Sequence, residues 1–104
     1  LKEESMKKIK IGGIHYDLVQ QDNLEDKNES VWGFVEYENS IIHIRTNMSK
    51  QKKAQTVIHE SLHAMLHEAG LDDVANDEKL VTPLGNMIYQ FIKENPELIN
   101  EFRG

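Results

Sequence analysis

The feature that most constrains this chain is the pentapeptide His59-Glu60-Ser61-Leu62-His63, which fits the pattern H-E-x-x-H. On a helix, side chains four positions apart lie one above the other on the same face, so His59 and His63 can converge on one metal ion. Zn²⁺ is the usual occupant of such a pair, and Glu60 is placed to accept a proton from water at that ion. The pentapeptide therefore predicts a helix that carries both a metal site and a general base.

The residues on either side of the motif also favour a helix. Residues 51–69 carry apolar side chains at helical spacing: Ala54, Val57, Ile58, Leu62, Met65, Leu66 and Ala69. At about 100° per residue, His59 and His63 border this apolar stripe, so we expect the metal site at the rim of the core, within reach of a substrate. Gly70 is expected to end the helix. Three residues are candidates for its N-cap: Ser49, Thr46 and Asn47.

A third histidine further along this helix, His67, is expected to lie outside the metal site. His59 and His67 are eight residues apart, which is about 12 Å along a straight helix. Zn–N bonds are only about 2.0–2.1 Å long, so one ion cannot bind both side chains. Another segment must therefore complete the site.

The third ligand is expected from the next predicted helix, residues 77–94. Its apolar stripe is Leu80, Leu84, Met87, Ile88 and Phe91. Glu78 lies in the first turn beside this stripe, so packing of the two helices through their stripes would bring Glu78 to His59 and His63. Asp77 is the competing ligand, and Asp77 or Asn76 is also a candidate N-cap. The alternative for both acidic residues is that they bind no metal and only complement the positive end of the helix dipole.

Length and composition exclude several classes of protein. The 104 residues predict one domain, residues 1–104, and the absence of cysteine excludes disulfides and thiolate ligands. The net charge of −6 disfavours nucleic-acid binding, which depends on Lys and Arg. No apolar run approaches the about 20 residues that span a membrane, and no signal-peptide pattern is present. We therefore expect a cytoplasmic protein without membrane or nucleic-acid partners; the pattern does not indicate an oligomeric state.

The N-terminal half has the alternating pattern of strands. Three strands are predicted, over 8–20, 31–37 and 41–45. Gly12-Gly13 interrupts the first as a hairpin turn or a bulge, and residues 22–30 form a polar, acidic loop. The order of strands followed by helices predicts an α+β fold. We expect a small, mostly antiparallel sheet of three to four strands, packed on the motif helix and a C-terminal helix. A short last helix begins at Pro96.

The segment Val57–Met65, with Glu78 downstream, resembles the gluzincin pattern of the zincins. The chain is more closely similar to small metallopeptidase-like proteins of bacterial prophages and mobile elements. Four further segments carry this similarity: Gly12-Gly13-Ile14-His15-Tyr16, Asp77-Glu78, Gly85-Asn86 and Asn95-Pro96-Glu97-Leu98. The resemblance implies a minimal zincin-like fold whose edge strand, here Ile41–Arg45, lies over the cleft and pairs with a peptide or protein substrate.

These patterns predict a zinc-dependent metallopeptidase, with Zn²⁺ on His59, His63 and Glu78 and with Glu60 as general base. Three side chains are candidates to stabilise the oxyanion: Tyr89, Tyr37 and His43. Two alternatives stay open. One is a zinc-binding but non-catalytic protein-interaction module of phage origin. The other is a small α+β binding domain without metal, in which the H-E-x-x-H pattern is coincidental.

Overall fold

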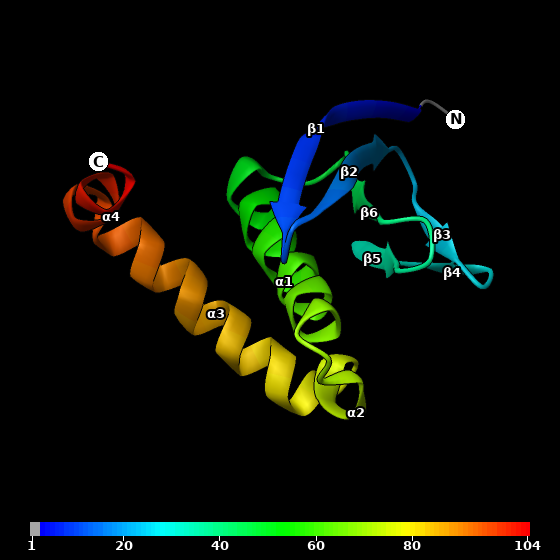
Figure 1. Ribbon diagram of the computed structural model, residues 1–104. Coiled ribbons are helices and arrows are strands. Elements are labelled where there is room, and N and C mark those ends of the chain that lie inside the picture. Colours follow the sequence, from blue (N-terminus) through cyan, green and yellow to red (C-terminus); the bar gives the residue numbers. More distant parts are fainter. Residues whose placement is uncertain (1–2) are drawn as a thin grey trace.

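The computed structural model describes residues 3–104, with side chains from Lys8 onward; residues 1 and 2 of the predicted domain lie outside the described residues. A four-stranded sheet has the order β1-β2-β6-β5, with β1 (Glu3–Ile11), β2 (Ile14–Gln21), β5 (Gly33–Glu36) and β6 (Ile41–Arg45). Between β2 and β5 lies a small hairpin of β3 (Glu25–Asp26) and β4 (Glu29–Ser30). Four helices follow: α1 (Lys50–Glu68), α2 (Asp72–Ala75), α3 (Glu78–Glu94) and α4 (Pro96–Arg103). The predicted α+β class is confirmed (Figure 1).

The glycine pair forms a two-residue hairpin turn between β1 and β2. Gly12 and Gly13 have φ angles of 57° and 86°, which residues with a Cβ rarely adopt. A Cβ on Gly12 would also lie 2.9 Å from the Cβ of Glu68, at the end of α1. The Tyr16 hydroxyl donates a hydrogen bond of 2.6 Å to the Glu68 carboxylate. The hairpin is thereby held against the C-terminal end of the motif helix.

The expected edge strand, β6, lies inside the sheet instead. It pairs in parallel with β2 and antiparallel with β5, so the prediction that Ile41–Arg45 forms the edge is wrong. The residue before β6 is bonded to β2: the Asp17 amide donates a hydrogen bond of 2.9 Å to the Ser40 carbonyl. Ile42 and Ile44 are fully buried, as suits an interior strand. Among the strands of residues 3–104, β5 pairs with β6 alone and forms one edge of the sheet, and β1 forms the other.

The segment expected to be a polar loop, residues 22–30, contains the β3–β4 hairpin. Lys27 and Asn28 occupy its turn with φ angles of 55° and 67°. Leu24 is buried, and its carbonyl accepts a hydrogen bond from the Val31 amide. This segment is therefore anchored to the body of the protein just before β5 begins.

Helix α1 covers one face of the sheet and forms the core with it. The core side chains are Ile11, Tyr16, Leu18, Ile42, Ile44 and Ala64. Burial of a side chain such as Leu or Ile contributes about 1.5–3 kcal/mol, so this cluster fixes α1 on the sheet. The longest run of buried residues on α1 is 60–64, which lies within and just after the motif. The fold therefore holds the H-E-x-x-H turn firmly beside β5.

The ends of α1 follow the predicted signals. The Ser49 hydroxyl accepts a hydrogen bond from the Lys52 amide and caps the N-terminus. Gly70 has a φ of 81°, and the amides of Gly70 and Leu71 donate to the carbonyls of His67 and Leu66. These paired bonds satisfy carbonyls that a helix end otherwise leaves without partners.

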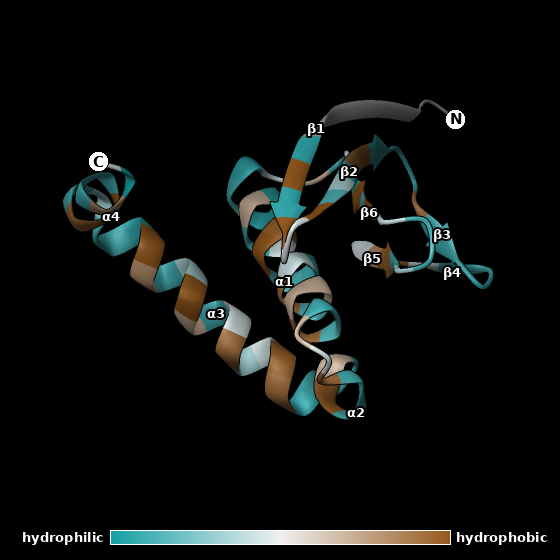
Figure 2. Ribbon diagram, viewed as in Figure 1, coloured by the Kyte–Doolittle hydropathy of each residue, from teal (hydrophilic) through white to brown (hydrophobic). Residues whose placement is uncertain are grey.

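Helix α3 contacts α1 mainly through its first turns and then diverges from it towards α4 (Figure 1). Val81 and Gly85 are buried, but most of the predicted apolar stripe is exposed and appears as brown bands along α3 in Figure 2. The exposed apolar side chains of α3 are Leu80, Leu84, Met87, Phe91 and Ile92. Divergence leaves an apolar groove of about 850 Å³ between the two helices. None of the helices in residues 3–104 combines the length and apolar character of a membrane-spanning segment.

Candidate metal centre

The three predicted ligands come together where α3 begins against α1. The His59 Nε2 atom lies 3.0 Å from Glu78 Oε1, and the His63 Nε2 atom lies 3.3 Å from Glu78 Oε2. All three side chains offer a ligand atom within 4.8 Å of the others. In a tetrahedral zinc site with bonds of about 2.0–2.1 Å, neighbouring ligand atoms are about 3.3 Å apart. Two imidazoles and a carboxylate at this spacing therefore fit a zinc ion.

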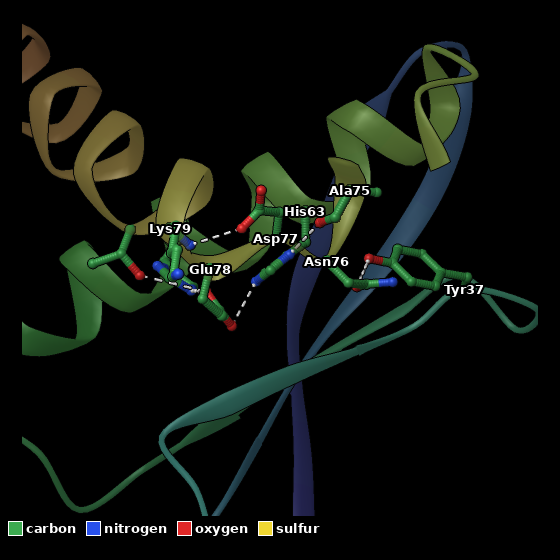
Figure 3. Close-up of polar contacts among 9 residues, drawn as sticks. Tyr37, His63, Ala75, Asn76, Asp77, Glu78 and Lys79 are labelled. Atoms are coloured by element: carbon green, nitrogen blue, oxygen red, sulfur yellow. Dashed lines mark hydrogen bonds and ion pairs between the residues drawn. The ribbon is translucent and has the colours of Figure 1, made fainter. Parts of the chain in front are cut away.

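The ring of His63 is oriented by a backbone carbonyl. Its Nδ1 atom lies 2.6 Å from the carbonyl oxygen of Ala75, the last residue of α2. A carbonyl can only accept, so Nδ1 donates to Ala75, and Nε2 is the ring nitrogen that is turned towards Glu78 and available to a metal. Figure 3 shows His63 between the Ala75 carbonyl and the Glu78 carboxylate. The short helix α2 thus orients the ring of His63 in the way that a metal ligand requires.

His59 faces α3 at the point of closest approach between the two helices. A Cβ on Gly85 would lie 3.6 Å from the Cα of His59 and 4.0 Å from its Nδ1, so the small residue lets the helices approach. Burial lowers the pKa of His59, against the opposing effect of the Glu78 carboxylate. A neutral imidazole is the form that binds a metal.

The competing acidic residue and the third histidine have other roles. Asp77 caps α3, because its carboxylate accepts a hydrogen bond of 3.0 Å from the Lys79 amide. His67 makes a contact of 2.6 Å from Nδ1 to Asp72, and its ring stacks on Tyr37 with centroids 4.4 Å apart. Neither belongs to the cluster of ligand atoms.

Glu60 is a buried carboxylate at the boundary of two pockets. Its side chain makes no hydrogen bond or ion pair with any described residue, and the residue is only 7% exposed. Burial, reinforced by the Glu78 carboxylate, raises the pKa of Glu60 to about 8. An acid whose pKa lies near neutrality is suited to accept and return a proton.

Two pockets meet at Glu60 and Gly33. The first, of about 420 Å³, extends along α1 towards Lys52 and Trp32. The second, of about 550 Å³, extends along β5 past His63 and Glu78. The ligand cluster therefore lies in the floor of a cleft whose wall is the edge strand β5.

Of the three oxyanion candidates, Tyr37 lines the same pocket as Glu60, His63 and Glu78. Its hydroxyl donates to the Asn76 side chain at 2.8 Å. Burial raises the pKa of Tyr37 to about 12, with a smaller contribution from the nearby carboxylates of Glu60, Asp72 and Glu78, so the hydroxyl keeps its proton at neutral pH. Tyr89 instead lines the apolar groove.

The third candidate, His43, lies on the other side of the sheet. Alternation along β6 turns His43 away from the face that carries Ile42 and Ile44, and its ring stacks on Phe34 with centroids 4.3 Å apart. His43 is therefore a packing residue of the far face.

Sequence reasoning missed two features of the site, the Ala75 carbonyl and Gly33. A glycine within a strand pattern indicates close backbone approach, and Gly33 carried that signal. A backbone carbonyl that orients a histidine ring cannot be recognised in this way, because every residue type has one. Comparisons of the chain with protein-family models, with curated proteins and with solved structures found no match. The chemistry of the site is therefore argued from its own geometry.

Proposed function

We propose that this chain is a zinc-dependent metallopeptidase with a minimal zincin-like arrangement. The observation that carries the proposal is the convergence of His59, His63 and Glu78 from two helices, next to a buried carboxylate without a partner. A coincidental motif requires neither the downstream Glu78 nor a cleft beside it. The Nδ1–carbonyl contact of His63 adds support, because metal-binding histidines usually donate their second ring N–H in this way.

In this proposal His59, His63 and Glu78 hold the ion, and Glu60 moves the proton. Zinc bound there would supply a Lewis acid for the substrate carbonyl and lower the pKa of a water molecule towards neutrality. Glu60 accepts a proton from the attacking water and delivers it to the leaving nitrogen, so that the amide yields a carboxylic acid and an amine. Tyr37, which stays protonated, would turn its hydroxyl proton from the Asn76 side chain to the carbonyl oxygen as negative charge develops there.

The edge strand supplies a place for an extended peptide. The Arg45 amide donates to the Trp32 carbonyl at 2.8 Å, so the backbone groups of Trp32 face β6. In an antiparallel ladder this orientation alternates from residue to residue, so the N–H and C=O groups of Gly33 and Val35 face away from β6. A peptide that pairs with these groups would lie along β5, above Glu60.

The test combines metal content with turnover. Protein purified without a polyhistidine tag should contain about one zinc per chain and should cleave members of a mixed peptide library. Glu60→Gln should keep the zinc and lose cleavage, because the substitution removes the proton acceptor but none of the ligands. Wild-type protein that contains no metal after dialysis against zinc would contradict the proposal, and so would cleavage by Glu60→Gln at the wild-type rate.

A second function is favoured by the exposed stripe on α3. Leu80, Leu84, Met87 and Phe91 are each more than a third exposed, and such a patch is typical of a protein-binding surface. The zinc would then hold a non-catalytic interaction module together. The wild type and Glu60→Gln together separate the alternatives: a module would bind zinc and would cleave no peptide of the library, and Glu60→Gln would change neither property.

A further inference from the structure

The two pockets that meet at Glu60 differ in charge. The first pocket is lined by one lysine, Lys52, and by the amide side chains of Gln55 and Asn86. The second is lined by three carboxylates outside the metal centre, Asp26, Glu36 and Glu38, against one ammonium group, that of Lys27. The cleft is therefore cationic on one side of the candidate metal centre and anionic on the other.

Lys52 is held in position at the cationic end. Its Nζ atom lies 3.7 Å from the centroid of the Trp32 ring and donates to Gln55 Oε1 at 3.4 Å. The Gln55 amide in turn donates to Asn86 Oδ1 at 2.8 Å, which ties the pair to α3. Among the described side chains, no carboxylate forms an ion pair with Lys52. Its charge thus remains available to a carboxylate that enters the pocket.

The anionic end offers the opposite charge. Within the described part of the chain, neither Asp26 nor Glu38 forms an ion pair. Glu36, on the face of β5 that is turned away from α1, lies 3.7 Å from the His43 Nε2 atom. With Glu60 and Glu78 assigned to the metal centre, this end keeps an excess of negative charge that suits a lysine or arginine side chain.

The direction of β5 relates these ends to the direction of a bound peptide. β5 runs from Gly33, at the boundary with the Lys52 pocket, to Glu36, in the acidic pocket. Antiparallel pairing is more stable per residue than parallel pairing. An antiparallel peptide would therefore place its C-terminal half at Lys52 and its N-terminal half beside the carboxylates.

We propose that the cleft selects peptides with a basic side chain on the N-terminal side of the scissile bond and a carboxylate on the C-terminal side. This inference rests on the proposed function and adds a substrate class to it. The carboxylate is either an acidic side chain or the peptide's own C-terminus. Because the charges act partly through solvent, the preference weakens as salt is raised beyond about 0.15 M.

The test measures binding to zinc-loaded Glu60→Gln by fluorescence anisotropy. Two amidated peptides of equal composition carry Lys before and Glu after a central neutral dipeptide, or the reverse. We expect the Lys-first peptide to bind about tenfold more tightly at low salt, and a free-acid peptide with Lys but no Glu to bind between the two. Equal binding, or tighter binding of the Glu-first peptide, would overturn the inference.

A matched pair of variants locates the effect. Lys52→Glu, in the Glu60→Gln background, should abolish the preference, whereas Lys53→Glu makes the same charge change outside the two pockets and should keep it. The milder Lys52→Gln should reduce the preference if Lys52→Glu fails to fold. A preference unchanged in both Lys52 variants would overturn the assignment of Lys52.

Cleavage by the wild-type enzyme separates this inference from the proposed function. Library peptides cleaved without any charge preference would overturn the inference alone. Preferential binding of the Lys-first peptide without cleavage of any peptide, at full zinc content, would overturn the peptidase function and leave the binding preference in place.

Discussion

Gly33 and Glu60 occupy positions that leave no room for a side chain between them. A Cβ on Gly33 would lie 3.0 Å from Glu60 Cγ and 2.8 Å from the carbonyl oxygen of His43. The edge strand therefore approaches the candidate general base as closely as its backbone allows. This spacing brings the outward-facing backbone groups of β5 close to the proposed reaction centre.

Gly33→Ala is expected to lower turnover more than zinc binding. The added methyl must displace β5 or Glu60, and overpacking of this kind costs about 1–3 kcal/mol of stability. The ligands lie on α1 and α3, so zinc content should stay near the wild-type value while kcat/KM falls. Unchanged kcat/KM in Gly33→Ala would show that the contact has no part in the reaction.

Glu78→Ala and Asp77→Ala should have opposite effects on the metal and on the fold. Glu78→Ala removes a ligand, so its zinc content, measured by mass spectrometry of metals, should fall well below one per chain. Asp77→Ala removes the N-cap of α3, which typically costs about 1 kcal/mol of stability, and should keep the zinc. If Asp77→Ala lost the zinc and Glu78→Ala kept it, Asp77 would be the ligand and Glu78 would not.

Glu60→Gln should stabilise the metal-free protein above neutral pH. Burial raises the pKa of Glu60 from 4.5 to about 8, so the folded state binds more protons than the unfolded state between these values. The free energy of unfolding of the metal-free wild type should therefore fall as the pH rises from about 4.5 to about 8, and level off above. Glu60→Gln lacks this pH dependence. Its free energy of unfolding should therefore exceed that of the wild type by on the order of a few kcal/mol at pH 9, and by little at pH 4.

The measurement is urea denaturation of both proteins in a chelator at pH 4, 7 and 9. His59→Gln provides a control. It removes a predicted zinc ligand but leaves the Glu60 carboxylate in place, so it should keep the pH dependence of the wild type. An equal pH dependence in wild type and Glu60→Gln would mean that the buried carboxylate is solvated well enough to carry its charge.

Tyr37→Phe should slow the reaction without releasing zinc. The substitution removes only the hydroxyl that lines the pocket with Glu60, and loss of one such donor typically costs about 10²–10³ in kcat. Tyr89→Phe makes the same change in the apolar groove and should leave kcat at the wild-type value. If both variants turn over at the wild-type rate, Tyr37 serves only to pack against His67 and bond to Asn76.

The local features of the fold could be predicted because each depends on a few neighbouring residues. The Gly12-Gly13 turn, the Ser49 cap and the start of α4 at Pro96 follow from backbone preferences and single hydrogen bonds. The spacing of His59, His63 and Glu78 on two helices likewise led to a prediction of their convergence, and the structure brings the three side chains together.

The strand order could not be predicted in the same way. Whether β6 lies beside β2 or at the edge depends on pairing between residues far apart in sequence, such as Leu18 and Ile42. The run Ile41-Ile42-His43-Ile44 was a signal for an interior strand, and the resemblance to a family with an edge strand over the cleft outweighed it. The predicted apolar stripe of α3 was also misleading in part, because the buried residues of this helix are Val81 and Gly85, whereas most of the stripe is exposed.

Because α3 diverges from α1, an ion bound at this site would restrain the position of the whole helix α3. Glu78 lies in the first turn of α3, whereas the two histidines lie on α1, so a bound ion would act as a cross-link at the base of a lever. Beyond this point, α3 and α4 form an arm that diverges from α1 (Figure 1). Removing the ion would loosen the whole arm, including turns far from the ligands, and open its backbone to proteases.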